Sequence, residues 1–177
     1  VFNCEHVVPQ SWFKGEVLQR AQKSDMHHLF TCDSGCNSFR SNIPYSRFSE
    51  AERAAILAAE VSAAEALVDP SLEAARAQCG LREGRRFEPT AGRGPAARAT
   101  LYFVLRYPGA VGNIKTGSKK EFVKSNVDIL LDWAEAEPPD TYEQHRNAEI
   151  AKVQGNRNPL IDHPEWLREI AFADGFG

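Results

Sequence analysis

The residues Phe-Asn-Cys-Glu-His-Val-Val-Pro at positions 2–9 decide how the N-terminal part of the chain folds. This run is rich in valine and phenylalanine and ends at Pro9, so it predicts a β-strand over 2–8. Residues 26–31, Met-His-His-Leu-Phe-Thr, predict a second short strand. A long loop then separates two strands that can pair.

A turn and a helix follow the second predicted strand. Residues 32–35, Cys-Asp-Ser-Gly, are typical of a turn. Ser34 can cap a helix that carries Asn37 and Arg40 one helical turn apart. The N-terminal segment is therefore predicted as strand, loop, strand and helix.

The rest of the chain is predicted to be helical. Helical spacing or apolar runs indicate helices at 50–68, 97–107, 119–136 (capped by Ser118), 141–153 and 164–172, with a further turn or two in 71–78. A buried strand stays open as the alternative for 97–107, since the run is apolar on all sides. The fold class is α+β, a mostly helical single domain over 1–177, with 49–80 as a helical insertion and 81–177 as a helical remainder.

Composition is that of a globular domain. Hydrophobic residues make up 42% and charged residues 25% of the 177 residues, so a packed core is expected and disorder is not. The sequence has no apolar window of about eighteen residues, and no transmembrane helix is predicted. The chain begins at Val1 without a methionine or signal peptide. We expect the natural protein to extend upstream, with any targeting segment there.

Charge is segregated along the chain. The net charge of −3 argues weakly against a nucleic-acid partner. Residues 82–98 nevertheless hold five arginines against two glutamates, and a second basic run comprises Lys115, Lys119, Lys120 and Lys124. A basic face and a set of solvated surfaces are both compatible with this pattern.

Four cysteines, Cys4, Cys32, Cys36 and Cys79, permit two disulfides in three pairings. The alternative is a zinc site built from Cys32, Cys36, His27 and His28. No second Cys or His pair follows at zinc-finger spacing, which disfavours zinc. Disulfides are favoured over free thiols if the protein is exported.

Four residues carry the types of side chain that phosphodiester hydrolysis needs. Histidine is a base near neutrality, and His6 could activate water. Mg²⁺ prefers oxygen ligands such as the Glu5 carboxylate and the Asn37 amide carbonyl. Arg40, one helical turn after Asn37, could brace a phosphate. Taken singly, each of these residues has an ordinary structural role, and only the combination predicts a site.

The placement of Glu5 and His6 raises a geometric difficulty. Neighbouring residues on a strand point to opposite faces of the sheet. Both can serve one site only if the strand ends, bulges or twists at that point. Pro9 follows closely and makes a strand end there plausible.

Several sequence blocks, in order, cover most of the chain outside 49–80: Glu-His-Val-Val-Pro-Gln-Ser-Trp-Phe (5–13), Ser-Asp-Met-His-His-Leu (24–29), Asn-Ser-Phe-Arg-Ser-Asn (37–42), Phe-Glu-Pro (87–89), Ala-Arg-Ala-Thr-Leu-Tyr-Phe-Val-Leu-Arg-Tyr (97–107), Leu-Leu-Asp-Trp (130–133), Pro-Pro-Asp-Thr-Tyr-Glu-Gln-His-Arg-Asn (138–147) and Gln-Gly-Asn-Arg-Asn-Pro-Leu-Ile-Asp-His-Pro (154–164). Together these blocks resemble the endonuclease I family of His-Me finger, or ββα-metal, nucleases.

The resemblance implies a small ββα-metal unit over 1–48 and a role for each site residue. His6 corresponds to the general base, and Glu5 and Asn37 to the magnesium ligands, with Mn²⁺ or Ca²⁺ as substitutes. Arg40 falls at a basic position that can contact phosphate. Asp25 and His27 correspond to a supporting pair beside the site.

The resemblance also implies a function and a location. Family members cleave DNA, and often RNA, without marked sequence preference and leave 5′-phosphate ends. Many are secreted or periplasmic. No membrane partner is expected, and the loop at 154–159 is expected to be structural.

Some positions depart from the family pattern. Lys23 stands where several relatives have a carboxylate, and Thr31 stands where proline is common. The Ala-rich stretch 50–78 has no counterpart in that pattern. A catalytically decayed nucleic-acid-binding or interaction domain is therefore the alternative function, although Glu5, His6 and Asn37 are all present.

Overall fold

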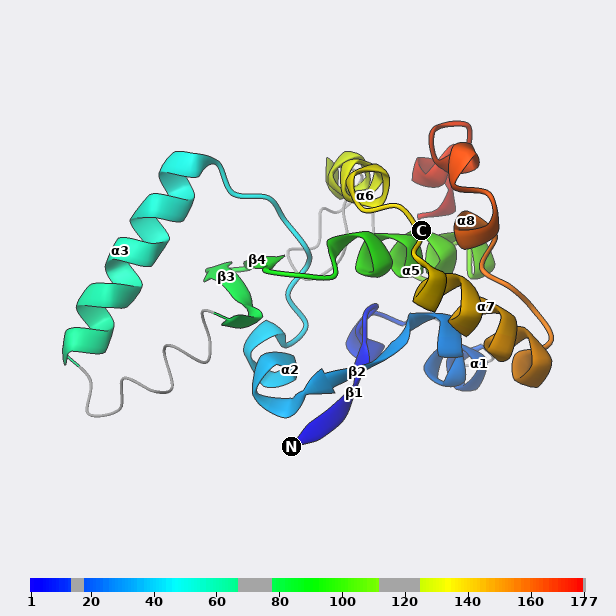
Figure 1. Ribbon diagram of the computed structural model, residues 1–177, viewed down its shortest axis with the longest axis horizontal. Helices are drawn as coiled ribbons and strands as arrows, with labels where there is room; N and C mark the ends of the chain where they lie inside the picture. Colours follow the sequence, from blue (N-terminus) through cyan, green and yellow to red (C-terminus); the bar gives the residue numbers. More distant parts are fainter. Residues whose placement is uncertain (14–17, 67–77, 112–124, 177) are drawn as a thin grey trace.

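The computed structural model describes residues 1–13, 18–66, 78–111 and 125–176 (Figure 1). Two small antiparallel sheets accompany a larger set of helices, which confirms the predicted α+β, mostly helical single domain. Among the described residues, no helix is long and apolar enough to cross a membrane.

The N-terminal ββα unit forms as predicted. Strand β1 (Phe2–His6) pairs antiparallel with β2 (Leu29–Asp33), with Glu5 opposite Phe30 and His6 opposite Leu29. Helix α2 (Ser34–Arg40) follows β2 directly and contacts both strands (Figure 1). The loop between the strands contains the 3₁₀ helix η1 (Gln10–Trp12) and helix α1 (Gln19–Ser24).

Strand β1 ends at His6 rather than at residue 8, and β2 continues to Asp33, so Cys32 and Asp33 extend the strand instead of forming the predicted turn at 32–35. Two further details differ from the sequence prediction. Residues Met26–His28 form the 3₁₀ helix η2 rather than the start of β2, because the Asp25 carboxylate accepts the His27 N–H at 3.0 Å and caps a turn there. Asp33, not Ser34, caps α2, since its carboxylate accepts the N–H groups of Gly35 and Cys36. Aspartate is as good an N-cap as serine, and the helix simply begins one residue earlier.

A second hairpin was not predicted. Strand β3 (Gly80–Glu83) pairs with β4 (Arg86–Pro89), and Gly84 takes a positive φ of 55° in the connecting turn. Arginine and glutamate make up half of these strand residues, and each strand has one large apolar side chain, Leu81 or Phe87, which explains why the alternation was weak in the sequence. Phe87 is buried and bridges to Tyr45, which ties the hairpin to the segment after α2.

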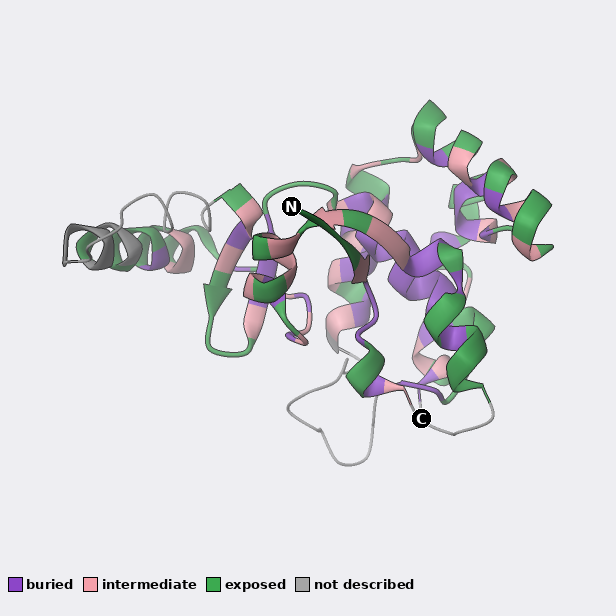
Figure 2. Cartoon of the chain, turned by 90° about the horizontal axis from the view of Figure 1, so that it is seen from below, coloured by how far each residue is buried: buried purple, intermediate pink, exposed green. Residues whose placement is uncertain are grey.

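The core is built around helix α5 (Arg93–Arg106), which starts four residues before the predicted helix and excludes the buried-strand alternative for 97–107. It packs against α6 (Ser125–Ala136), and Figure 2 shows the buried residues concentrated there. The predicted cap Ser118 and residues 119–124 lie outside the described residues, as do most of 71–78. The remaining elements are α7 (Thr141–Gln154), α8 (Pro159–Asp162), η3 (Pro164–Arg168) and η4 (Phe172–Gly175), so the predicted helix at 164–172 is two separate 3₁₀ turns.

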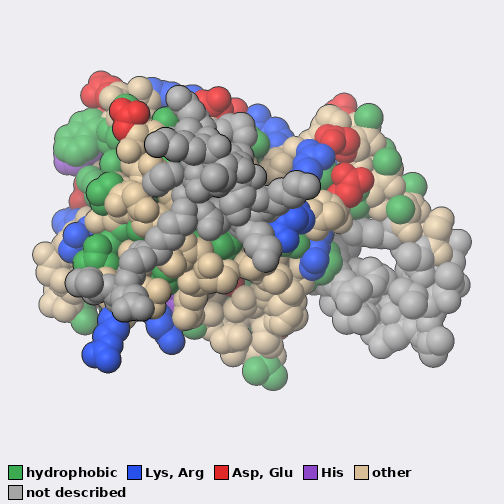
Figure 3. Space-filling view, turned by 180° about the vertical axis from the view of Figure 1, so that it is seen from behind, with side chains coloured by type: hydrophobic (Ala, Val, Ile, Leu, Met, Phe, Trp, Pro, Cys, Tyr) green, Lys and Arg blue, Asp and Glu red, His purple; other side chains and the backbone are tan. Residues whose placement is uncertain are grey.

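Helix α3 (Glu50–Ala66) confirms the predicted helix and projects from the rest of the molecule (Figure 1). Its N-terminus is a capping box, in which Ser49 N–H donates to the Glu52 carboxylate and Glu52 N–H donates to the Ser49 hydroxyl. Acidic and basic side chains intermingle where this helix joins the body (Figure 3). That 49–80 is an insertion stays a prediction.

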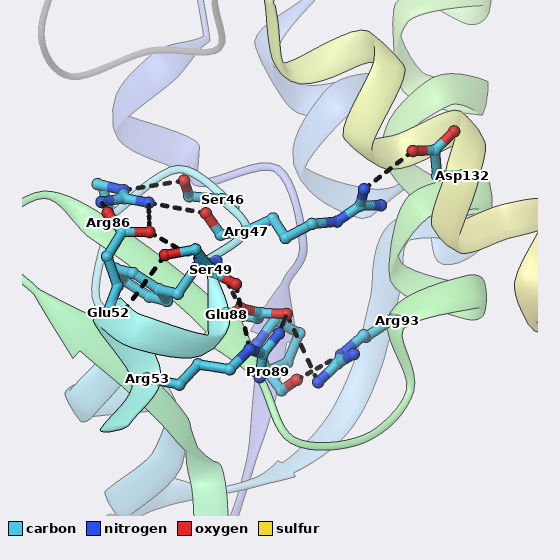
Figure 4. Close-up of polar contacts among 11 residues, drawn as sticks. Ser46, Arg47, Ser49, Glu52, Arg53, Arg86, Glu88, Pro89, Arg93 and Asp132 are labelled. Atoms are coloured by element: carbon cyan, nitrogen blue, oxygen red, sulfur yellow. Dashed lines mark hydrogen bonds and ion pairs between the residues drawn. The ribbon is translucent and has the colours of Figure 1, made fainter. Parts of the chain in front are cut away.

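The buried carboxylate of Glu88 joins α3 to the body. It accepts the backbone N–H of Phe48 at 2.8 Å and pairs with Arg53 of α3. Arg93, at the start of α5, lies 3.6 Å away, and the two arginines approach Glu88 from opposite sides (Figure 4). Glu88 is 1% exposed, so these partners compensate the cost of burying its charge.

One disulfide, Cys36–Cys79, links α2 to the residue before β3. The Cys36 sulfur is thereby lost as a zinc ligand, which removes the zinc site considered from the sequence. Cys4 and Cys32 are free thiols. They lie on adjacent strands, where Cys4 is paired with Thr31 and Cys32 with Asn3. Paired residues share one side of the sheet and neighbouring residues alternate, so the two thiols point to opposite sides of the sheet.

Candidate active site

Three residues singled out from the sequence meet in one cleft. Glu5, His6 and Asn37 line a cleft of about 260 Å³. Strand β1 ends at His6, so the alternation of strand faces stops there and neighbouring side chains can reach the same cleft. The other lining residues are Cys4, Pro9, Gln10, Ser41 and Asn42.

Glu5 is half-buried and held by Arg40. The Arg40 Nη1 donates to Glu5 Oε1 at 2.5 Å. Burial raises the pKa of the Glu5 carboxyl, and the Arg40 charge and hydrogen bond offset only part of that rise, so the pKa lies above its ordinary value. The guanidinium therefore fixes the carboxylate in place at the edge of the cleft.

Arg40 itself lies beneath the cleft rather than in it. Its side chain is 4% exposed, and it also donates to the backbone carbonyls of His6, Val7 and Ile43 at 2.8–3.2 Å. The guanidinium lies 4.6 Å from the centre of the Tyr45 ring. This placement favours a role in positioning Glu5 over the phosphate contact expected from the sequence.

Replacing Arg40 with leucine should lower the free energy of unfolding by about 3 kcal/mol, because a half-buried carboxylate and three carbonyls would lose their donor. Urea unfolding measures this. The matched control is Arg168→Leu, since Arg168 is about half exposed and pairs with Asp132 and Glu135 at the surface, where less than about 1 kcal/mol is expected. Equal losses in the two variants would contradict the positioning role.

The His6 ring is oriented by a main-chain carbonyl. Its Nε2 lies 3.0 Å from the carbonyl oxygen of Lys23. A carbonyl only accepts, so Nε2 carries the proton in this contact and Nδ1 keeps its lone pair. Nδ1 is thus the nitrogen that can act as a base.

Asn37 reaches the cleft from the first turns of α2. Its amide nitrogen donates to the Cys4 carbonyl at 3.2 Å, and this leaves the amide oxygen as its group for a ligand. Its neighbour Cys36 is held by the disulfide. Asn37 is therefore fixed to β1 on one side and to the β3 region on the other.

The donor set fits a hard divalent cation. Glu5 contributes a carboxylate and Asn37 an amide oxygen, and Mg²⁺ is typically bound by one or two protein oxygens with water and phosphate completing its shell. Within 1–13, 18–66, 78–111 and 125–176, no group of three or more His, Cys, Asp or Glu side chains forms a fuller metal cage. A site that relies on substrate oxygens to complete the shell is the kind these residues can build.

Asp25 and His27 are not brought to the cleft. The Asp25 carboxylate accepts hydrogen bonds from Tyr102, Tyr107 and Gln154 at 2.9 Å. Burial raises the pKa of Asp25, but these hydrogen bonds and that of the His27 N–H outweigh it, so the pKa lies below its ordinary value.

The His27 ring is directed away from the cleft as well. Its Nε2 donates to the Asn156 carbonyl at 2.9 Å. Asp25 and His27 therefore fasten η2, and with it the start of β2, to α5 and to the loop after α7. The loop at 154–159 contributes further through Gln154, which accepts the Met26 N–H at 2.8 Å.

A sequence model of the endonuclease I family matches residues 1–165. The chain belongs to the endonuclease I family.

Several extracellular nucleases are similar to this endonuclease I chain. The extracellular ribonuclease of Bacillus subtilis (strain 168) is 32% identical over 178 residues, which cover 96% of this chain and 54% of the relative. The extracellular deoxyribonuclease of Aeromonas hydrophila is 29% identical, over 89% of this chain and 64% of the relative. A periplasmic deoxyribonuclease of the same organism is 28% identical, over 89% and 62%. The chain spans about half the length of the Bacillus ribonuclease.

The structure shows what Lys23, which departs from the endonuclease I pattern, contributes to the site. Lys23 contributes its backbone carbonyl to His6, and its side chain is exposed. Any residue at this position can supply that carbonyl. The side chain present there therefore does not decide how His6 is held.

His28, considered from the sequence only as a ligand of the zinc site, also lies near the cleft. His28 is fully buried, donates from Nε2 to the Gln22 carbonyl at 2.6 Å and packs its ring against the edge of the His6 ring, with centroids 5.4 Å apart. Burial lowers the pKa of His28 to about 4, although the Gln22 hydrogen bond opposes this shift. His28 is therefore a neutral side chain that supports the cleft from within the core.

The depressed pKa of His28 predicts a loss of stability in mild acid. The unfolded histidine takes up a proton near pH 6.5 and the folded one near pH 4, so stability is complete above pH 6.5 and falls by roughly 3 kcal/mol as the pH drops to 4. Urea unfolding at pH 7 and pH 4.5 measures the decrease. His28→Gln should show a smaller decrease, whereas the control His145→Gln, at an exposed histidine, should behave like wild type. An unchanged decrease in His28→Gln would refute this assignment.

Proposed function

We propose that this chain is a divalent-metal-dependent endonuclease that hydrolyses phosphodiester bonds of DNA and RNA, with His6 as the general base. The observation that carries the proposal is the convergence of Glu5, His6 and Asn37 on one cleft, with His6 Nδ1 left as the unprotonated nitrogen. The relatives named as extracellular ribonuclease and deoxyribonuclease support both substrates.

Proton transfer falls to His6. Its Nδ1 takes a proton from a water molecule, which then attacks phosphorus. The Nε2 proton stays on its hydrogen bond to Lys23, whose carbonyl dipole stabilises the positive ring that results. That hydrogen bond does not break during the transfer, so Nε2 stays in place throughout.

Glu5 and Asn37 would hold Mg²⁺, with Mn²⁺ or Ca²⁺ as substitutes. When bound, the cation polarises the phosphoryl oxygen and stabilises the departing oxygen. Arg40 keeps the Glu5 carboxylate oriented toward the cleft and balances its charge before the cation arrives. Asp25 and His27 act at a distance, by fixing the segment that leads into β2.

In this proposal the protein contacts the sugar-phosphate backbone of the nucleic acid. Contacts to phosphates carry no sequence information, so cleavage should show no marked sequence preference. Binding should weaken as salt rises, because phosphate contacts release counterions. Extracellular or periplasmic action is proposed from the names of the relatives and from the Cys36–Cys79 disulfide, which suits an oxidising compartment.

The proposal is tested by the metal requirement of Glu5→Gln. We expect cleavage of RNA and of supercoiled DNA by the parent chain to require Mg²⁺, and Glu5→Gln to need at least about tenfold more Mg²⁺ for half its maximal rate. The control Glu169→Gln removes an exposed carboxylate outside the cleft and should leave the requirement unchanged. Cleavage that persists in chelator, or an unchanged requirement in Glu5→Gln, would exclude the assignment of the metal ligands.

A further inference from the structure

Among the cleft side chains to which the proposed mechanism gives no role, Gln10 is the one that contacts the His6 ring. Gln10, the first residue of η1, lies against the His6 ring. Its amide nitrogen is 3.3 Å from His6 Nδ1 and 3.4 Å from His6 Nε2. Gln10 is exposed and lines the cleft together with His6.

The two nearly equal distances define how the amide lies on the ring. The lone-pair and N–H directions of the two ring nitrogens diverge, so a donor equidistant from both cannot lie along either. A position in the ring plane between them would collide with the ring carbons. The Gln10 amide nitrogen therefore lies over the face of the imidazole, in an N–H···π contact. This leaves the in-plane lone pair of Nδ1 available.

Gln10 completes a set of three contacts around the ring of His6. The Lys23 carbonyl fixes Nε2, the His28 ring packs edge-on at 5.4 Å, and the Gln10 amide covers one face. The first contact leaves the ring free to rotate about the line through that hydrogen bond. A group on the face removes this freedom.

The turn that carries Gln10 is itself firmly anchored. Trp12, two residues on, is 1% exposed, and its backbone N–H donates to the Pro9 carbonyl at 2.9 Å. Ser11 accepts a hydrogen bond from the Asn42 amide across the cleft. Gln10 therefore projects from a fixed backbone, as a positioning group must.

We propose that Gln10 is a positioning residue for the general base: its amide holds the plane of the His6 imidazole so that Nδ1 faces the attacking water. The inference rests on the proposed function, since it has meaning only if His6 is the base. A small misalignment of a reacting group is enough to lower a rate by one to two orders of magnitude. Loss of the amide should therefore affect the chemical step and not substrate binding.

The first part of the test separates catalysis from binding and from folding. Gln10→Ala should lower kcat about tenfold, with KM within about twofold and the melting temperature unchanged. Gln10→Met keeps the length of the side chain without the amide and should be as slow as Gln10→Ala. The control is Gln144→Ala, at an exposed glutamine of α7. A raised KM with normal kcat, or full activity in Gln10→Met, would overturn the proposal.

The second part is a double-mutant cycle with His6→Ala. If Gln10 acts only through His6, replacing Gln10 has no further effect once His6 is absent. The double variant should therefore nick plasmid at the same residual rate as His6→Ala. A further tenfold loss in the double variant would mean that Gln10 acts on the substrate directly and would overturn the positioning role. If His6→Ala alone is fully active, the proposed function fails, and that result is distinct from a failure for Gln10.

Discussion

Replacing His6 with alanine is expected to lower kcat/KM for a short oligonucleotide about 10³-fold, which is within the range that general-base catalysis contributes. Nδ1 of His6 is the only nitrogen of this ring without a carbonyl partner. The metal ligands Glu5 and Asn37 remain in the variant, so metal and substrate binding should persist. KM should therefore change little, and almost all of the loss should appear in kcat.

The neighbouring histidines cannot replace His6 in this account. Both are buried, and the Nδ1 atom of each, which has no carbonyl partner, is buried too, whereas His6 lines the cleft. The control is His145→Ala, at an exposed histidine on α7, which should cleave like wild type. A His6→Ala variant within about tenfold of wild type would reject His6 as the base and direct attention to another group of the cleft.

Removing the Cys36–Cys79 disulfide is expected to cost about 4 kcal/mol of stability, because the bond closes a loop across a sequence separation of 43 residues. Cys36→Ser with Cys79→Ser and urea unfolding measure this. The loss of the bond also frees the start of α2, where Asn37 sits next to Cys36. The variant should therefore need more Mg²⁺ for cleavage even under conditions where it is folded.

A free cysteine provides a control for this change. Cys32→Ser replaces a partly exposed thiol of β2 that has no disulfide, and it should cost far less stability. Adding a thiol reductant to the parent chain should reproduce the double serine variant. If the double variant unfolds at the same urea concentration as wild type, the disulfide contributes nothing to holding α2 and β3 together.

The order strand, loop, strand and helix could be predicted because its signals are local. The Val-rich run closed by Pro9 and the turn residues before α2 appear in the sequence itself. The capping role of Asp25 and the hairpin from Gly80 to Pro89 were not predicted. The hairpin depends on tertiary contacts, such as the Phe87–Tyr45 bridge, that no local pattern encodes. The Asp25 cap is a local contact to the His27 N–H, but residues 26–31 have the composition of a strand, and this concealed the 3₁₀ turn.

The site follows the same division. The types of the residues Glu5, His6 and Asn37 indicate metal and base chemistry, and their convergence needed only the end of a strand. Arg40 could be identified as important but not assigned to Glu5, since an arginine can brace a phosphate or a carboxylate equally well. The contact of the Lys23 carbonyl with His6 could not be predicted, because every residue type has a backbone carbonyl and the sequence does not show which one is used.

Glu5, His6 and Asn37 are proposed to form one metal-dependent phosphodiesterase site. The most direct test is cleavage of supercoiled plasmid by the parent chain with Mg²⁺, with chelator, and by His6→Ala. The account predicts nicking and digestion with Mg²⁺, and their loss in both other conditions. Cleavage that survives chelator or the His6→Ala change would contradict it, and a folded parent chain that binds DNA without cutting it would indicate a decayed scaffold instead.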